Sequence, residues 1–291
     1  MMGAMLLLLL SLAGPQNAFS FRVEVLKDTF YQMEPVVVKL VLKNESGETY
    51  YLDQYNAIYD GLEMHVYDER GDTLEPKIHT EILRVPLHFL EDIEIEGGDS
   101  VVEFYDYQAG YSDSLGIPPG RYIVRARDSL RVVGYGVVEL SEVEDTFWVV
   151  EPEGEEREAF EFLKKFYSPS MGYFLKQKYN FPKGKTRYRY YLEFLQKFPH
   201  SIYTPLVLSL YASASILAGK RSEWLEARKR LITEFPDTYE AYTGAMQLAD
   251  MAKEEVLPFL REVVERHPNS LAASGVRKVI SEGELMEGGG R

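Results

Sequence analysis

The stretch Leu231-Ile232-Thr233-Glu234-Phe235-Pro236-Asp237-Thr238 holds the pattern that decides the fold of the second half of the chain. The same pattern occurs at Phe198-Pro199 and at His267-Pro268, so the prolines lie 37 and 32 residues apart. Each copy has apolar residues five and four positions before the proline, a ring directly before it, and a Ser or Thr two positions after it. A residue before proline avoids the α region, which ends one helix, and the hydroxyl can cap the next. The pattern therefore predicts helix-turn-helix units with a period of about 34 residues.

These motifs resemble the tetratricopeptide repeat, in the divergent F-P-x-S form common in bacterial envelope proteins. The resemblance implies a helical-repeat scaffold over residues 186–285, with helices near 186–198, 204–218, 222–235, 239–251, 253–267 and 270–282. We expect Phe194, Leu231 and Phe235 to lie in its core. The second copy departs from the family because Arg228 occupies a position where a ring is usually buried. A compact helical bundle with repeat-like turns is the alternative.

Composition limits the possible classes of protein. A chain of 291 residues is long enough for two domains. The absence of Cys excludes disulfides, thiolate metal sites and Cys nucleophiles. Residues 21–150 hold 11 Lys and Arg against 26 Asp and Glu, a net charge of −15, whereas residues 151–291 hold 21 against 20. Because binding to a nucleic acid requires a basic face, the acidic first half argues against a nucleic-acid partner.

The N-terminus has the features of an export signal. Residues 4–13 form an apolar run that stops at Gly14-Pro15 and is too short to span a bilayer, which needs about 20 residues. Ala18-Phe19-Ser20 places small residues at the −3 and −1 positions of a cleavage site. We expect residues 1–20 to be a signal peptide and the mature chain to be periplasmic or extracellular. An uncleaved anchor and a buried N-terminal segment are the alternatives.

Residues 21–152 carry the alternation of β-strands. Strands are expected at 21–25, 36–43, 48–53, 62–68, 81–90, 100–107, 121–127 and 135–150, with turns such as Asn44-Glu45-Ser46-Gly47 between them. This spacing predicts an antiparallel β-sandwich. Pro118-Pro119-Gly120-Arg121-Tyr122 and the stretch from Phe30 to Val38 resemble immunoglobulin-like and fibronectin-like domains. In those domains a tyrosine placed like Tyr122 closes a corner by bonding to the upstream backbone.

The strand pattern stops at Glu151-Pro152-Glu153-Gly154. Residues 153–185 read as a helical linker segment, with acidic residues in the first turn of a helix and breaks at Pro169 and Pro182. Residues 286–291 are expected to form a disordered tail. The fold class is therefore multidomain, an all-β unit followed by an all-α unit.

No motif for catalysis or for a cofactor is present. The five histidines form no His-x-His or His-x-x-x-His pair, and no acidic cluster has the ligand spacing of a calcium loop. Gly-x-Ser-x-Gly and the glycine-rich phosphate loops are also absent. We expect no cofactor, no metal and no enzymatic activity. The alternative that stays open is a catalytic pair of carboxylates, because any of the 46 acidic residues could come together in the fold.

The segment from Gly172 to Tyr191 is unusual because it holds six basic residues, seven aromatic residues and no acid. Three interpretations stay open: the rings pack inside the first repeat, the segment docks onto the acidic β domain, or it binds an external anionic component of the envelope. Under the third interpretation the exposed candidates are Tyr173, Lys176, Tyr179, Arg187 and Arg189.

The sequence favours a non-enzymatic, exported adaptor that binds a protein or peptide through helical repeats and a β-sandwich. A carbohydrate- or cell-wall-binding module is the alternative, because Tyr50, Tyr51, Tyr55 and Tyr59 could stack on the sugar rings of a polysaccharide.

Overall fold

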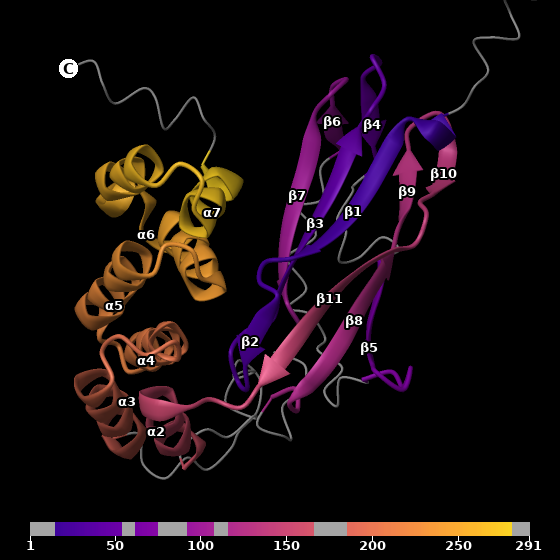
Figure 1. Cartoon of the computed structure of the whole chain (residues 1–291). Coiled ribbons are helices and arrows are strands. Elements are labelled where there is room, and N and C mark those ends of the chain that lie inside the picture. Colours follow the sequence, from indigo (N-terminus) through magenta and orange to yellow (C-terminus); the bar gives the residue numbers. More distant parts are fainter. Residues whose placement is uncertain (1–14, 54–61, 75–91, 108–115, 166–184, 281–291) are drawn as a thin grey trace, which may run out of the picture. The chain divides into compact units, whose positions relative to one another are not determined.

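A computed structural model describes residues 15–53, 62–74, 92–107, 116–165 and 185–280 (Figure 1). The chain divides into two compact units, Met1–Val150 and Glu151–Arg291. The first is built of strands and the second of helices, so the division into an all-β and an all-α part agrees with the sequence analysis. None of the described helices is both long and apolar enough to cross a membrane.

The described residues of the β unit form three small sheets. Their orders are β1-β3-β7, β10-β9-β4-β6 and β2-β11-β8-β5. The strands are β1 (Phe19–Val25), β2 (Thr29–Tyr31), β3 (Val37–Asn44), β4 (Tyr50–Leu52), β5 (Glu63–Asp68), β6 (Ile93–Ile95), β7 (Ser100–Asp106), β8 (Gly120–Arg127), β9 (Ser129–Val132), β10 (Gly136–Glu139) and β11 (Val143–Val150). Neighbouring strands are antiparallel, except that β2 pairs with β11 in parallel. The expectation of a wholly antiparallel unit was therefore wrong at this pair, and the strand expected at 81–90 lies outside the described residues.

The single strand expected at 135–150 is two strands in different sheets. Val143 pairs with Ala126, and Glu139 pairs with Ser129, so residues 140–142 lie opposite only residues 127–128. The side of the ladder that contains 140–142 thus has one residue more than the opposite side. The buried residue of β10 is even-numbered (Val138), whereas the buried residues of β11 are odd-numbered. Residues 140–142 connect β10 in one sheet to β11 in another.

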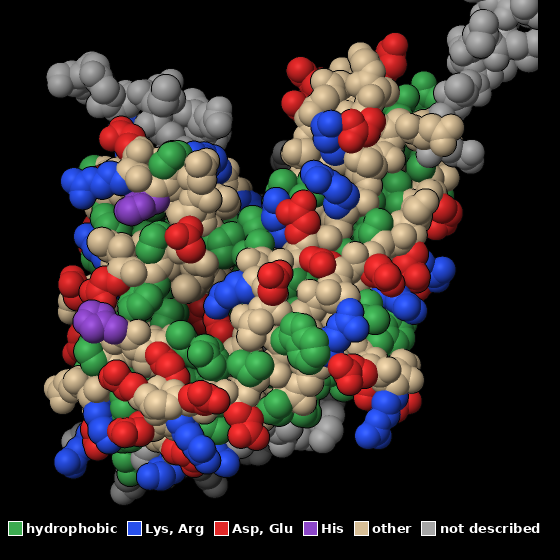
Figure 2. Space-filling model, viewed as in Figure 1, with side chains coloured by type: hydrophobic (Ala, Val, Ile, Leu, Met, Phe, Trp, Pro, Cys, Tyr) green, Lys and Arg blue, Asp and Glu red, His purple; other side chains and the backbone are tan. Residues whose placement is uncertain are grey.

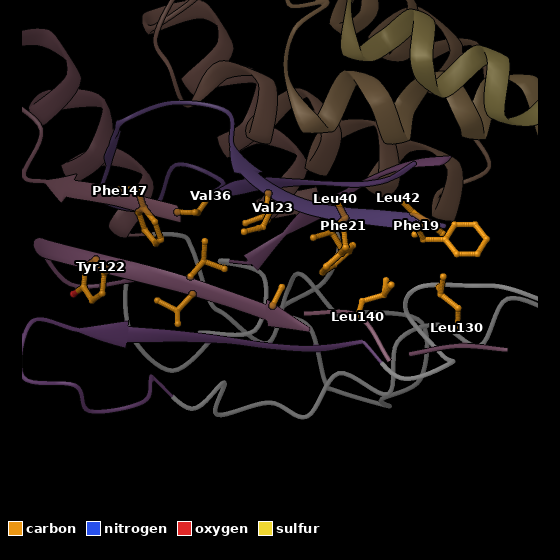
Figure 3. Close-up of a cluster of buried hydrophobic side chains, with 14 of the residues drawn as sticks. Phe19, Phe21, Val23, Val36, Leu40, Leu42, Tyr122, Leu130, Leu140 and Phe147 are labelled. Atoms are coloured by element: carbon orange, nitrogen blue, oxygen red, sulfur yellow. The ribbon is translucent and has the colours of Figure 1, made fainter. Parts of the chain in front are cut away.

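The core of the β unit lies between facing strands. Figure 3 shows Phe19 of β1 and Leu42 of β3 facing Leu130 of β9 across the core, with Tyr122 of β8 and Phe147 of β11 at the other end of the cluster. The Tyr122 ring stacks on Phe147 with 5.5 Å between ring centroids. Its hydroxyl donates a hydrogen bond of 2.7 Å to the Pro118 carbonyl. This is the upstream backbone bond expected of Tyr122.

Residues 15–20, placed in the signal peptide by the sequence analysis, are part of the folded β unit. Pro15–Asn17 forms a 3-10 helix, and β1 begins at Phe19, which pairs with Asn44. The Phe19 side chain is buried in the core and lies 5.3 Å from the Tyr50 ring, measured between centroids. Cleavage after Ser20 would therefore remove a core side chain and the first pairs of the β1–β3 ladder.

The helical unit consists, in the part that the structure describes, of six helices. They are α2 (Gly154–Lys164), α3 (Lys185–Lys197), α4 (Thr204–Leu217), α5 (Arg221–Glu234), α6 (Tyr239–Arg266) and α7 (Leu271–Val279). Two of the expected hydroxyl caps are confirmed, because Thr238 accepts from the Ala241 amide and Ser270 accepts from the Ala273 amide. At the first motif the N-cap of α4 is Tyr203 rather than Ser201.

Helix α6 covers two helices that the sequence analysis expected separately, 239–251 and 253–267. They join at a kink at Ala252, whose φ of −142° and ψ of 26° are not helical. Pro258 follows inside the second arm. At Gly275 on α7, an added Cβ would lie 2.4 Å from the Tyr242 carbonyl oxygen. Only glycine fits such close packing of α7 on α6.

The core of the helical unit contains two of the three expected residues. Phe194 and Leu231 are buried, but Phe235 is only half-buried, so its assignment to the core was wrong. Helix α2, which falls in the expected linker segment, packs into this core through Phe162, whose ring lies 5.9 Å from Phe194 and 5.8 Å from Phe198.

The two phenylalanines are expected to differ in their effect on stability. Phe194→Ala should lower the free energy of unfolding by about 3–5 kcal/mol, as for a fully buried ring. Phe235→Ala should cost less than about 2 kcal/mol, because part of the ring is already in water. Urea unfolding followed by helical circular dichroism measures both, and equal losses would contradict the assigned burial.

Residues 15–20 are expected to stabilise the β unit. A chain that begins at Phe21 should be less stable than one that begins at Pro15 by at least about 2 kcal/mol, because it lacks the buried Phe19 ring. Thermal unfolding of the two purified chains tests this, and equal stability would show that the segment is dispensable.

Candidate functional site

Of the five candidate residues of the basic aromatic segment, only Arg187 and Arg189 lie in the described part of the chain. Tyr173, Lys176 and Tyr179 lie outside the described residues. Arg187 lies in the first turns of α3, in a part whose side chains are not described, and Arg189 is exposed on the same helix. The described end of the segment instead holds rings that pack within the helical unit.

Tyr188 and Tyr191 are two such rings. The Tyr188 hydroxyl lies 2.8 Å from the Tyr211 hydroxyl on α4, and the ammonium of Lys220 lies 4.0 Å from the centroid of the Tyr188 ring. Tyr191 is buried. For these two residues the structure agrees with the interpretation in which the rings pack inside the helices.

The tyrosines proposed to bind sugars do not form one described platform. Tyr50 packs against Phe19 in the β unit, and Tyr51 is exposed on the next position of β4. The carboxylate of Glu94, opposite Tyr51 on β6, raises the pKa of the Tyr51 hydroxyl by its charge and by a hydrogen bond. Tyr55 and Tyr59 lie outside the described residues.

Helix α4 is unusual in the helical unit because of its composition. None of the fourteen residues from Thr204 to Leu217 is charged. The inner face of the helix is buried through Val207, Leu208 and Ala212. A helix that is apolar on all sides is normally buried on all sides.

The outer face of α4 is nevertheless accessible. Leu206, Leu210, Ser213 and Leu217 lie four, three and four residues apart, which places them on one face of the helix. Leu206 and Leu210 are half-buried, and Leu217 is 70% exposed, the largest value among the exposed large hydrophobic side chains of the described residues. We call these four residues the α4 stripe. In the sequence, the α4 stripe could have been recognised by the absence of charged residues over this helix. The sequence analysis considered only the repeat pattern there and did not identify it.

A buried cation lies beside the α4 stripe. The guanidinium of Arg228 on α5 donates 3.1 Å to Ser209 Oγ on α4 and 2.6 Å to Gln247 Oε1 on α6. Arg228 is 1% exposed, and its Nε has no hydrogen-bond partner among the described residues. No carboxylate of a described residue forms an ion pair with it, whereas Gln247 is itself exposed. The exposed amide thus covers a guanidinium that has no direct counter-ion.

Burial lowers the pKa of Arg228 to about 10, and the nearby charge of Glu240 offsets only part of this effect. Because the folded pKa lies below that of the unfolded chain, the buried cation opposes folding at every pH below about 10. Across the interface, an added Cβ at Gly244 would lie 3.3 Å from Leu231 and 3.5 Å from Arg228. The arginine is therefore enclosed by close packing of α6 on α5.

Among the described residues, no group of three His, Asp or Glu side chains is placed to hold a metal ion. The α4 stripe and Arg228 place an uncharged helix face beside one buried cation.

Because burying the charge of Arg228 costs free energy, removing the charge should not destabilise the protein. Arg228→Met keeps much of the side-chain volume and removes the charge, so the free energy of unfolding should stay within about 1 kcal/mol or rise. Arg228→Ala leaves a cavity and should cost about 2–4 kcal/mol. Chemical denaturation measures both variants. If Arg228→Met is as destabilising as Arg228→Ala, the hydrogen bonds to Ser209 and Gln247 outweigh the cost of burial.

Comparisons with known proteins do not assign the chain to a family. No protein-family model matches it, and no curated protein matches it. Among solved structures, the β part is similar to the CARDB domain of a protein from Pyrococcus furiosus, at 13% identity over 45% of this chain and 87% of that chain, with a TM-score of 0.25. It is also similar to the C-terminal domain of wzt, at 10% identity over 47% and 75%, with a TM-score of 0.28. An alpha-2-macroglobulin structure from Escherichia coli matches 92% of this chain and 53% of that one, at 9% identity and a TM-score of 0.27. Likenesses at this level carry no conclusion about function.

Proposed function

We propose that the chain is an exported, non-enzymatic adaptor whose helical unit binds an apolar segment of a protein partner on the α4 stripe. The observation that carries this proposal is the outer face of α4, where leucines stand in place of the charged residues expected on the solvent side of a helix. Exposed apolar faces of this kind are typical of interaction sites. An amphipathic peptide helix can pack on such a face through residues spaced three and four apart.

Arg228 adds a chemical preference to this site. A carboxylate on the bound segment could replace the exposed Gln247 amide and form a charge-assisted hydrogen bond with the guanidinium, which is stronger than the neutral bond that it displaces. The partner segment that fits best therefore carries apolar residues at helical spacing together with an Asp or Glu.

The architecture that we propose is an immunoglobulin-like sandwich followed by tetratricopeptide-like repeats. The Tyr122–Pro118 hydrogen bond supports the first part. The alternation of helices that end two residues before Pro199, Pro236 and Pro268 supports the second. In repeat proteins of this kind, neighbouring helices supply each other's core.

Export rests on the short apolar run at the N-terminus. The folded state of residues 15–20 argues that cleavage occurs before Pro15 rather than after Ser20. Ser11-Leu12-Ala13 provides small residues at suitable positions for such a cleavage.

Binding to the α4 stripe is tested with the full chain and a displayed library of random peptides. We expect enrichment of peptides with apolar residues at helical spacing and one acidic residue. Leu217→Glu should weaken binding of the enriched peptides at least tenfold, about 1.4 kcal/mol, without changing stability, because the side chain is exposed.

Met251→Glu is the matched control, since Met251 is an exposed apolar residue of α6 outside the stripe. This variant should bind the same peptides like the unmodified chain. The proposal fails if no peptide is enriched or if both variants lose binding equally.

A further inference from the structure

The outer face of the sheet β2-β11-β8-β5 carries an exposed tryptophan. Trp148 on β11 is 48% exposed, although one side of the same strand is buried through Phe147 and Val149. Trp148 pairs with Arg121 on β8 and with Thr29 on β2, so these three residues form one row across three strands. Figure 2 shows hydrophobic side chains with Lys or Arg beside them over β11 and β8.

Arginines line this face along β8. Arg125 pairs with Glu144 at 3.1 Å and lies 5.0 Å from the centroid of the Tyr67 ring. Arg127 pairs with Glu63 at 2.6 Å. Arg121 is exposed, and no carboxylate of a described residue lies within 4.0 Å of it. The cation beside the tryptophan therefore lacks the counter-ion that its neighbours have.

The surroundings of Trp148 favour a small polar ligand over a protein. A stable protein interface buries roughly 800 Å² per partner, and its centre is depleted of charged residues. Here the neighbours of Trp148 in the strand register are Arg121 and Thr29, and Thr146 lies two residues before it on the same strand. An indole offers a flat apolar surface, which suits the C–H face of a sugar ring, while the hydroxyls and the guanidinium suit its polar edge.

The net charge of the β unit limits which saccharides can bind next to Trp148. Residues 21–150 carry a net charge of −15, so the unit repels an extended polyanion. A short ligand with one or two carboxylates reaches Arg121 while avoiding most of the acidic surface. Arginine binds a carboxylate through two parallel hydrogen bonds.

We propose that Trp148 and Arg121 form a binding site for a sugar of the uronic-acid class, with the ring on the indole and the carboxylate on the guanidinium. This site is separate from the α4 stripe and from the tyrosines around Tyr51. The proposal does not depend on whether the helical unit binds a peptide.

The site can be observed directly by tryptophan fluorescence. The chain has two tryptophans, and Trp224 is buried in the helical unit, so a change on adding sugar reports Trp148. The probes are digalacturonic acid, its neutral counterpart digalactose, and a tetraglutamate peptide, each titrated into the full chain. Calorimetric titration provides a second measurement.

We expect digalacturonic acid to bind at least tenfold more tightly than digalactose, and binding should weaken as salt is added. Arg121→Gln should remove the preference for the acidic sugar, and Trp148→Ala should abolish binding of both sugars. Arg127→Gln is the matched control, because this arginine lies on the same strand and face but is already paired with Glu63. It should leave binding unchanged.

Three results would overturn the proposal. Equal binding of the neutral and acidic disaccharides would remove the role of Arg121. Binding of tetraglutamate in place of the sugar would make the site one for acidic peptides. Absence of binding to all three probes, with the variants still folded, would show that the exposed tryptophan is no sugar site.

Discussion

The helical unit depends on the burial of one uncharged helix. Helix α4 contributes Val207, Leu208 and Ala212 to the core and contacts α3, α5 and α6. Because it has no charged residue, its stability in water requires that most of its surface be covered. Its neighbours cover the inner side, whereas Leu217 on the outer side stays exposed. The absence of charge on α4 thus underlies both the core of the unit and the interaction surface that we propose.

In the β unit, the local sequence pattern predicted most strands but not how the strands pair into sheets. Alternation of apolar residues located β1, β3, β4, β5, β7 and β8 to within about two residues. The short strands β2, β6 and β9 were missed; a strand of three or four residues carries little alternation, and among the strands this short that were expected singly only β4 was located. The break between β10 and β11 was missed for a different reason: it shows only as a change from even to odd buried positions between Val138 and Phe147. The parallel pairing of β2 with β11 joins residues far apart in sequence, so it cannot be recognised from the local sequence of either strand.

The helices were predicted more accurately, since proline and hydroxyl signals mark their ends. The functional surfaces were not. The departure of Arg228 from the repeat pattern was recognised in the sequence, but its enclosure by Ser209 and Gln247 requires the packing of three helices. Trp148 was one apolar residue in a run, and only the burial of Phe147 and Val149 on β11 shows that it lies on the outer face. Burial of a residue depends on the register of its neighbours, which sequence alone did not define for these two residues.

The kinked helix α6 has a consequence for how the helical unit unfolds. In a stack of separate helical hairpins, an end repeat can open while the rest stays folded. Here the two arms of α6 meet at Ala252 with no loop between them. Gly275 of α7 packs on Tyr242 of the first arm, and Glu255 of the second arm forms an ion pair of 2.8 Å with Arg221 of α5. Melting of the terminal hairpin would therefore also release contacts with the first arm and with α5. The unit from α4 to α7 should therefore exchange its amide protons as a single cooperative block, and a partner bound on α4 would protect amides as far away as α7.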